Sequence, residues 1–185
     1  MSSRIILDLC GGSGAWSKPY REAGYDVRVI TLPEWDVADY TPHEEIHGIL
    51  AAPPCTEFSV AKANNPRDFD KGMSVVQHCL RIIWLARKRL GLKWWALENP
   101  RGFLRQFLGN PPYTFEQWYF GDDGIKPTDI WGYFCRPVPF VVKKPGNLVK
   151  KFPNGKTNSK NWSGSSAKRA ITPAGFAQAF YEANR

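Results

Sequence analysis

The stretch Ala51-Ala52-Pro53-Pro54-Cys55-Thr56-Glu57-Phe58-Ser59 follows an apolar run at residues 47–52, which predicts a short buried strand. The two prolines end this strand because neither can donate a backbone hydrogen bond. Proline also restricts its own φ and the residue before it, so the loop holds Cys55 in a fixed position relative to the sheet edge. This arrangement would present a nucleophile, although a small cysteine packed beneath the turn is the alternative interpretation.

Two further apolar segments are expected to form strands. Residues 4–9 are β-branched and apolar and run into a glycine-rich turn at 10–14, and residues 93–97 are followed by Glu98-Asn99-Pro100. Ligand groups in open α/β sheets collect at the carboxyl ends of the strands. We therefore expect the glycine turn, the Cys55 loop and Glu98 to meet at one edge of the sheet.

The segments between these strands predict the fold class. A helix is expected over residues 15–23, with Gly24 as its C-cap, and a strand over 25–31. Residues 73–90 carry an apolar stripe typical of a long amphipathic helix. The order strand, helix, strand predicts an α/β fold with a doubly wound, mostly parallel sheet.

The length and composition of the chain limit the number of domains, the location and the kind of partner that can be expected. The 185 residues are enough for one domain, and no apolar run is long enough to cross a bilayer. The N-terminus lacks the apolar core of a signal peptide, so a cytoplasmic protein without a membrane partner is expected. The four scattered cysteines signal neither a disulfide framework nor a metal site, and the net charge of +8 favours a polyanionic partner such as nucleic acid.

Two segments are candidates for binding a nucleoside-containing ligand. A strand, a glycine turn and a helix form a cradle that lets backbone approach a ligand, although a tight connection is the plainer interpretation. In the loop after the second strand, Glu34 is expected to bond ribose hydroxyls, and Asp36-Val37 lies where a carboxylate could accept from an adenine amino group. The alternative is that both acids are ordinary solvated side chains.

Three motifs occur in one order: Asp8-Leu9-Cys10-Gly11-Gly12-Ser13-Gly14, Pro53-Pro54-Cys55-Thr56-Glu57-Phe58-Ser59 and Glu98-Asn99-Pro100. Together they resemble the C5-cytosine DNA methyltransferase family. The resemblance implies a Rossmann-like methyltransferase fold with S-adenosyl-L-methionine in the glycine turn, where Cys10 takes the place of the family's Phe. It also implies that Cys55 is the nucleophile, that Glu98 is the acid held against the base and that Asn99 orders the loop. The expected cofactor contacts are Asp8, Cys10, Gly11, Gly12, Ser13, Gly14, Glu34, Asp36, Val37 and Pro53.

The implied reaction explains why these residue types are needed. Addition of a thiolate to C6 of cytosine creates an enamine whose C5 can attack the donor's methyl group. Negative charge then accumulates on the N3 and O2 side of the ring, so an acid at N3 and a cation near O2 lower the barrier. The C5 proton must then leave, often to water, and no residue is assigned as the base.

The residue expected to supply positive charge near O2 differs from the family pattern. The usual Gln-x-Arg-x-Arg stretch is absent, and residues 124–132 stand in its place, with a Lys-Pro-Thr-Asp-Ile-Trp segment that resembles short, often phage-borne members. Lys126 is the candidate for the O2 side, with Thr128 as a support; a surface lysine before a turn is the alternative. The segment 168–177, which leads into a helix to Asn184, resembles the family's last motif and would complete the donor pocket.

The large target-recognition domain of the family is also missing. A short basic insert at residues 143–169 stands in its place within a single catalytic domain, 1–185, and its lysines interleaved with Phe152 and Trp162 suit a phosphate backbone and stacked bases. A solvated loop is the alternative. DNA, duplex or single-stranded, is the expected partner, with a helper subunit, RNA or a free cytosine nucleotide as further possibilities. A catalytically weak nucleic-acid-binding protein of the same fold is the rival from another class.

Overall fold

The fold is built on a six-stranded mixed sheet with the strand order β2-β1-β3-β4-β6-β5. The computed structural model describes residues 4–62, 65–122, 124–146, 149–151, 157–159 and 170–185. Its strands are β1 (Ile5–Leu9), β2 (Asp26–Ile30), β3 (Ile46–Ala51), β4 (Trp94–Pro100), β5 (Tyr113–Glu116), β6 (Pro127–Tyr133), β7 (Val149–Lys151) and β8 (Thr157–Ser159). Its helices are α1 (Lys18–Glu22), η1 (Val60–Lys62), α2 (Phe69–Arg89), α3 (Arg105–Leu108), η2 (Gln117–Phe120) and α5 (Ala174–Ala183).

The sheet is mostly parallel, which confirms the predicted α/β class. Strands β2, β1, β3 and β4 pair in parallel, while β6 runs antiparallel to both of its neighbours, β4 and β5. The chain passes from β1 to β2 on one side and then returns to β3 on the other, so the strand order reverses between β1 and β3. Such a reversal opens a crevice at the carboxyl ends of the strands, where ligands bind in α/β sheets.

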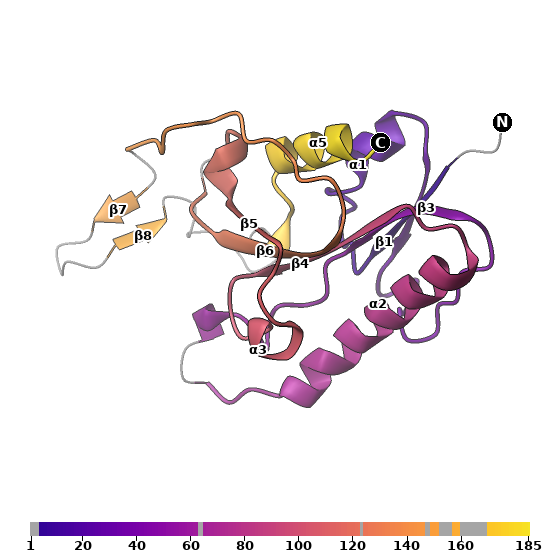
Figure 1. Ribbon diagram of the computed structural model, residues 1–185. Helices are drawn as coiled ribbons and strands as arrows, with labels where there is room; N and C mark the ends of the chain where they lie inside the picture. Colours follow the sequence, from indigo (N-terminus) through magenta and orange to yellow (C-terminus); the bar gives the residue numbers. More distant parts are fainter. Residues whose placement is uncertain (1–3, 63–64, 123, 147–148, 152–156, 160–169) are drawn as a thin grey trace.

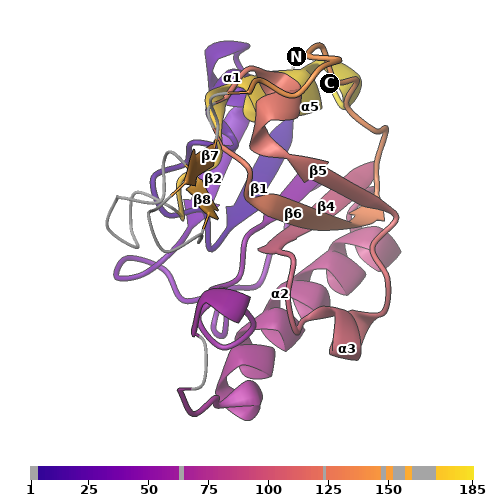
Figure 2. The ribbon, with the colours of Figure 1, turned by 90° about the vertical axis from the view of Figure 1, so that its left-hand side faces the viewer.

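Helices cover both faces of the sheet, as a doubly wound fold requires. Figures 1 and 2 show α2 on one face and the pair α1 and α5 on the other. The α2 face is aliphatic, with Val76 and Ile83 packed against β1 and β3. The opposite face is aromatic, and there Phe115 stacks on Phe176 with ring centroids 3.9 Å apart. The sheet is therefore packed between an aliphatic core on the α2 face and an aromatic core on the α1 and α5 face.

Two helix boundaries differ from the sequence prediction. The helix expected over residues 15–23 is confined to α1, because turns occupy the residues up to Ser17. Helix α2 starts four residues earlier than the expected Met73, at Phe69. Its N-cap is Asp68, whose carboxylate accepts from the backbone N–H of Lys71 at 2.9 Å. Aspartate is a preferred N-cap residue, so Asp68 in the sequence indicates this helix start.

Strand β4 is longer than the apolar run that predicted it. It continues through Glu98, Asn99 and Pro100 because these residues pair with β6, with Asn99 opposite Asp129. The polar residues expected just past the strand are therefore part of it. Strand β3 ends at Ala51, before the two prolines, as predicted.

The predicted basic insert at residues 143–169 falls mostly outside the described residues, including Phe152 and Trp162. Within it the structure describes the antiparallel pair β7 and β8. In the described part of the chain, none of the helices combines the length and apolar character needed to cross a membrane.

Candidate active site

The glycine turn after β1 has a backbone that only small residues allow. Cys10, Gly12 and Gly14 have φ values of 55°, 54° and 67°, in the left-handed region. A Cβ on Gly11 would lie 2.3 Å from the carboxyl carbon of Asp8, whereas a Cβ on Gly12 would meet nothing within 4 Å. Glycine is therefore required at position 11 for space and at positions 12 and 14 for conformation. The turn leaves room for a ligand beside its backbone.

Asp8 lies fully buried beneath this turn. Ser17 donates to its Oδ2 at 2.5 Å, while Oδ1 has no hydrogen-bond partner among the described residues. Burial raises the pKa of Asp8 to about 6, against the opposing effect of the Ser17 hydrogen bond. A buried acceptor without a partner calls for a donor from a bound molecule. Ser17 was not predicted from the sequence.

The raised pKa of Asp8 predicts how stability varies with pH. Between the ordinary value of 3.8 and about 6 the folded protein holds this proton while the unfolded chain has lost it. Stability from this group is thus present at low pH and falls as pH rises through about 6, by about 3 kcal/mol in total. We expect Asp8→Asn to remove most of this fall, measured as urea unfolding at about pH 4 and about pH 7.5. Equal stability differences between variant and wild type at both pH values would contradict the prediction.

Cys10 and Cys79 bring two thiols together under the turn. Their sulfur atoms are 4.0 Å apart, and all four cysteines of the chain are free thiols. The hydrogen bond with Cys79 lowers the pKa of Cys10, although burial and the charges of Asp8 and Asp36 oppose it. The turn, α2 and the loop after β2 therefore meet at Cys10.

The loop after β2 holds the two acids expected to bind a nucleoside. Glu34 and Asp36 are both exposed, and Asp36 accepts from the backbone N–H of Ala38 at 2.9 Å. Val37 differs from both, because its side chain is buried in the core on the α2 face. Arg81 donates to the carbonyls of residues 37, 38 and 40 at 2.8 to 3.1 Å. The loop is thus fixed from α2.

The Cys55 loop is held by a tight turn and by Asn99. The backbone N–H groups of Phe58 and Ser59 donate to the carbonyl of Cys55 at 3.0 and 2.8 Å. The buried Asn99 donates through Nδ2 to the carbonyl of Pro53 at 3.0 Å. Because Asn99 lies in β4, this bond ties the half-buried Cys55 to the neighbouring strand. It is the contact that the ordering role expected of Asn99 would need.

A second set of contacts joins this loop to the chain after β4. Arg67 donates to the carbonyls of Glu57 and Ser59 at 2.8 and 2.9 Å, and its guanidinium lies 4.5 Å from the ring centre of Phe103. A Cβ on Gly102 would lie 2.2 Å from the backbone oxygen of Phe58, so only glycine allows this approach. Sequence analysis missed Arg67, for which the loop composition gave no signal.

Glu98 lines a small pocket on the face covered by α5. The lining residues are Glu98, Phe115, Gln117, Lys126, Thr128, Ala170, Ile171, Thr172, Pro173 and Phe176. The space that a water-sized molecule could occupy is about 10 Å³, close to the room for one water. Burial and the charge of Asp129 raise the pKa of Glu98, and Lys126 opposes them. The structure therefore brings together three residues predicted for one site: Glu98, Lys126 and Thr128.

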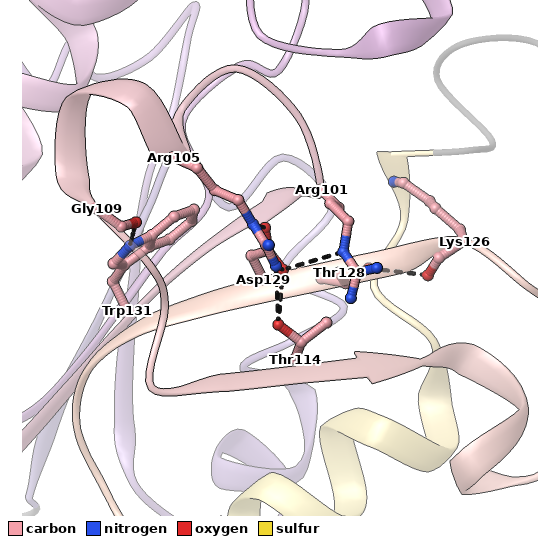
Figure 3. A network of polar contacts seen from close by, with 8 residues as sticks. All are labelled: Arg101, Arg105, Gly109, Thr114, Lys126, Thr128, Asp129 and Trp131. Carbon is pink, nitrogen blue, oxygen red and sulfur yellow. Dashed lines mark hydrogen bonds and ion pairs between the residues drawn. The ribbon is translucent and has the colours of Figure 1, made fainter.

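A buried carboxylate network supports β6, which contains Thr128 and begins directly after Lys126 (Figure 3). Arg105 donates to both oxygens of Asp129 at 2.6 Å, and Thr114 donates to Oδ1 at 2.8 Å. Arg101 Nε lies 3.9 Å from Asp129 Oδ1, with its side chain half exposed. Sequence analysis did not predict this network, because its residues come from three separate segments.

Among the described residues, three or more histidine, cysteine, aspartate or glutamate side chains nowhere come together in an arrangement that could hold a metal ion. A scan against protein-family models and a search of curated proteins found no match to this chain.

Proposed function

We propose that this protein is an S-adenosylmethionine-dependent methyltransferase of Rossmann-like fold that methylates C5 of cytosine in DNA through Cys55. The observation that carries the proposal is the position of three chemical groups at one sheet edge. The glycine turn, the Cys55 loop and Glu98 follow or end neighbouring parallel strands, β1, β3 and β4, beside the point where the strand order reverses.

The glycine turn fits the proposed cofactor. S-adenosylmethionine supplies an electrophilic methyl group when bound. The unpartnered Oδ1 of Asp8 would accept from its amino group, and the open space at Gly12 would admit its chain beside the backbone. Glu34 and Asp36 are exposed and available to the ribose and the adenine.

The chain's own residues would perform the reaction in a fixed order. The Cys55 thiolate adds to C6 of cytosine, which forms a carbon–sulfur bond and places electron density on C5 and on the N3 side of the ring. Glu98, whose pKa is raised chiefly by burial, gives a proton to N3, while Lys126 balances charge near O2. After C5 takes the methyl group, with the neutral thioether S-adenosylhomocysteine as the leaving group, water removes the C5 proton. The electrons of the C5–H bond then form the C5–C6 double bond and expel the thiolate. N3 then gives its proton back.

Replacing Glu98 by glutamine tests the acid role. We expect kcat to fall by about 100-fold, because an amide can donate a hydrogen bond to N3 but cannot transfer a proton. The wild-type rate should rise with pH as Cys55 ionises and fall again as Glu98 loses its proton; the variant should keep only the rise. A pH–rate profile of methyl transfer measures both limbs. A variant that keeps the fall at high pH would show that another group is the acid.

The pocket beside Glu98 must open for a pyrimidine ring to enter. Its room for about one water is too small for a base, and its outer wall comes from Ala170, Ile171 and Thr172. These residues are half-buried or exposed, so they can move without disrupting the core. A cytosine in duplex DNA would also have to be flipped out of the stack to reach Cys55.

The proposal is tested by transfer of radiolabelled methyl from S-adenosylmethionine to duplex DNA, single-stranded DNA, RNA and free deoxycytidine nucleotides. Label in one of these pools identifies the reaction and the substrate class, and label in none of them, with the cofactor bound, contradicts the catalytic assignment unless a helper subunit restores it.

The closed pocket and the net charge of +8 favour one other function, nucleic-acid binding without catalysis. A substrate with 5-fluorocytosine separates the two. Fluorine stands in place of the C5 proton and cannot be removed by a base, so a methyltransferase leaves a covalent adduct that Cys55→Ser cannot form. A binding protein gives salt-sensitive binding without an adduct.

A further inference from the structure

A second and larger pocket lies at the opposite end of β4. It is lined by Arg87, Leu92, Lys93, Trp94, Trp95 and Tyr133 and has a volume of about 280 Å³. These residues come from the last turn of α2, the start of β4 and the end of β6. Glu98 lies four residue steps beyond Trp94 along the extended strand, which is about 13 Å. The pocket therefore shares no residue with the candidate active site.

The walls of this pocket combine positive charge with aromatic rings. Arg87 and Lys93 are exposed, and the ring of Tyr133 is 73% exposed. Trp94 and Trp95 line the pocket as well, but their indole N–H groups are buried. Trp94 is only 6% exposed, and its ring packs against Tyr20 and Phe180. A ligand would thus meet flat apolar surface from the half-buried Trp95, which lies opposite Tyr133, and polar groups from Arg87, Lys93 and the tyrosine hydroxyl.

The neighbouring surface of α2 has the same character. Trp84 is 59% exposed, and the Lys88 ammonium lies 4.9 Å from the centre of its ring. Trp84, Arg87 and Lys88 are spaced three and four residues apart, so they share one helix face. The nearby carboxylate of Glu45 packs beside Gly91 and does not line the pocket. Cations and aromatic rings therefore continue outward from the pocket.

We propose that this pocket binds one nucleotide unit, with the base against Tyr133 and the tryptophan surface and the phosphate between Arg87 and Lys93. Aromatic side chains stack with any base, and paired cations suit a phosphate. A volume just below the range of ordinary small-molecule sites suits one nucleotide and no more. The nucleotide is either free or part of a single strand that continues over Trp84 and Lys88.

The two sources are separated by measuring binding of dCMP and AMP by calorimetry and of a labelled single-stranded 12-mer by anisotropy. We expect Tyr133→Ala and Lys93→Gln each to weaken binding at least about fivefold, from the loss of one stacking partner or one phosphate contact. Arg89→Gln is the matched control. Arg89 is exposed in the same turn of α2 as Arg87, carries the same charge as Lys93 and does not line the pocket. Both pocket side chains are exposed, so the fold should be retained, as circular dichroism would check.

Binding of mononucleotides identifies a free nucleotide as the ligand, and binding of the 12-mer alone identifies a strand. In either case, photocrosslinking of a 4-thiothymidine probe should label the peptide that contains Tyr133, also in a Cys55→Ser variant. Methyl transfer need not occur for this result, so the proposal and the catalytic assignment can fail separately. Equal weakening by Arg89→Gln, crosslinks confined to other peptides, or no binding of either probe would overturn the proposal.

Discussion

Cys55→Ser should reduce methyl transfer to cytosine by about 1,000-fold or more. The serine hydroxyl is not ionised at neutral pH, so C6 is not attacked and C5 is not activated. The loop itself should be unchanged, because backbone atoms of residues 53–59 and the side chain of Asn99 hold it. The measurement is initial rate with saturating S-adenosylmethionine and the nucleic acid that accepts label.

Cys79→Ser is the matched control for this variant. Cys79 is buried, close to Cys10 and far from the Cys55 loop in sequence, and it has no place in the proposed reaction. It should keep methyl transfer within about an order of magnitude, with any loss caused by a hydroxyl buried in the core. If Cys55→Ser retained wild-type activity, the nucleophilic mechanism would be wrong.

Asp129→Ala should lower the free energy of unfolding by about 3–5 kcal/mol, the cost of breaking a buried ion pair. The Asp129 side chain is fully buried and accepts two hydrogen bonds from Arg105 and one from Thr114. Its removal deprives Thr114 of this acceptor and leaves the Arg105 guanidinium, among the described residues, with only the Thr114 hydroxyl oxygen, at 3.3 Å. Urea unfolding monitored by tryptophan fluorescence measures the loss.

Arg101→Ala is the control for that change. Its Nε lies 3.9 Å from Asp129 and its side chain is 51% exposed, so its removal should cost less than about 1 kcal/mol. A loss of similar size in both variants would mean that the effect comes from surface charge and not from the buried network.

Three of the four parallel strands, β1, β3 and β4, could be predicted because each contains a short apolar run closed by glycine, proline or a polar residue. Strand β2 was expected because it follows the helix C-cap Gly24. The two prolines end β3 where they were expected to, and the glycine turn follows β1. Short-range chemistry decides these boundaries, so the residues alone carry the signal. The edge at which Asp8, Cys55 and Glu98 collect follows from the parallel order.

The antiparallel strand β6 could not be predicted in the same way. Its buried Asp129 reads as a surface residue until Arg105 and Thr114 are known to face it, and these partners lie 24 and 15 positions away. Pairing with β6 also draws Glu98 and Asn99 into β4. Such long-range contacts depend on the whole fold. The segment 168–177 was expected to complete the donor pocket, and its residues 170–173 and 176 line the Glu98 pocket.

Residues 170–176, which form one wall of the Glu98 pocket, are synthesised after the strands that carry the rest of the candidate site. The ribosome makes β1, β3 and β4 well before this segment, and domains form from the N-terminal side first. A nascent chain that has not reached Phe176 has its glycine turn and its Cys55 loop but not the wall beside Glu98. The Cys55 thiol, the proposed nucleophile, is therefore made well before the wall of the Glu98 pocket.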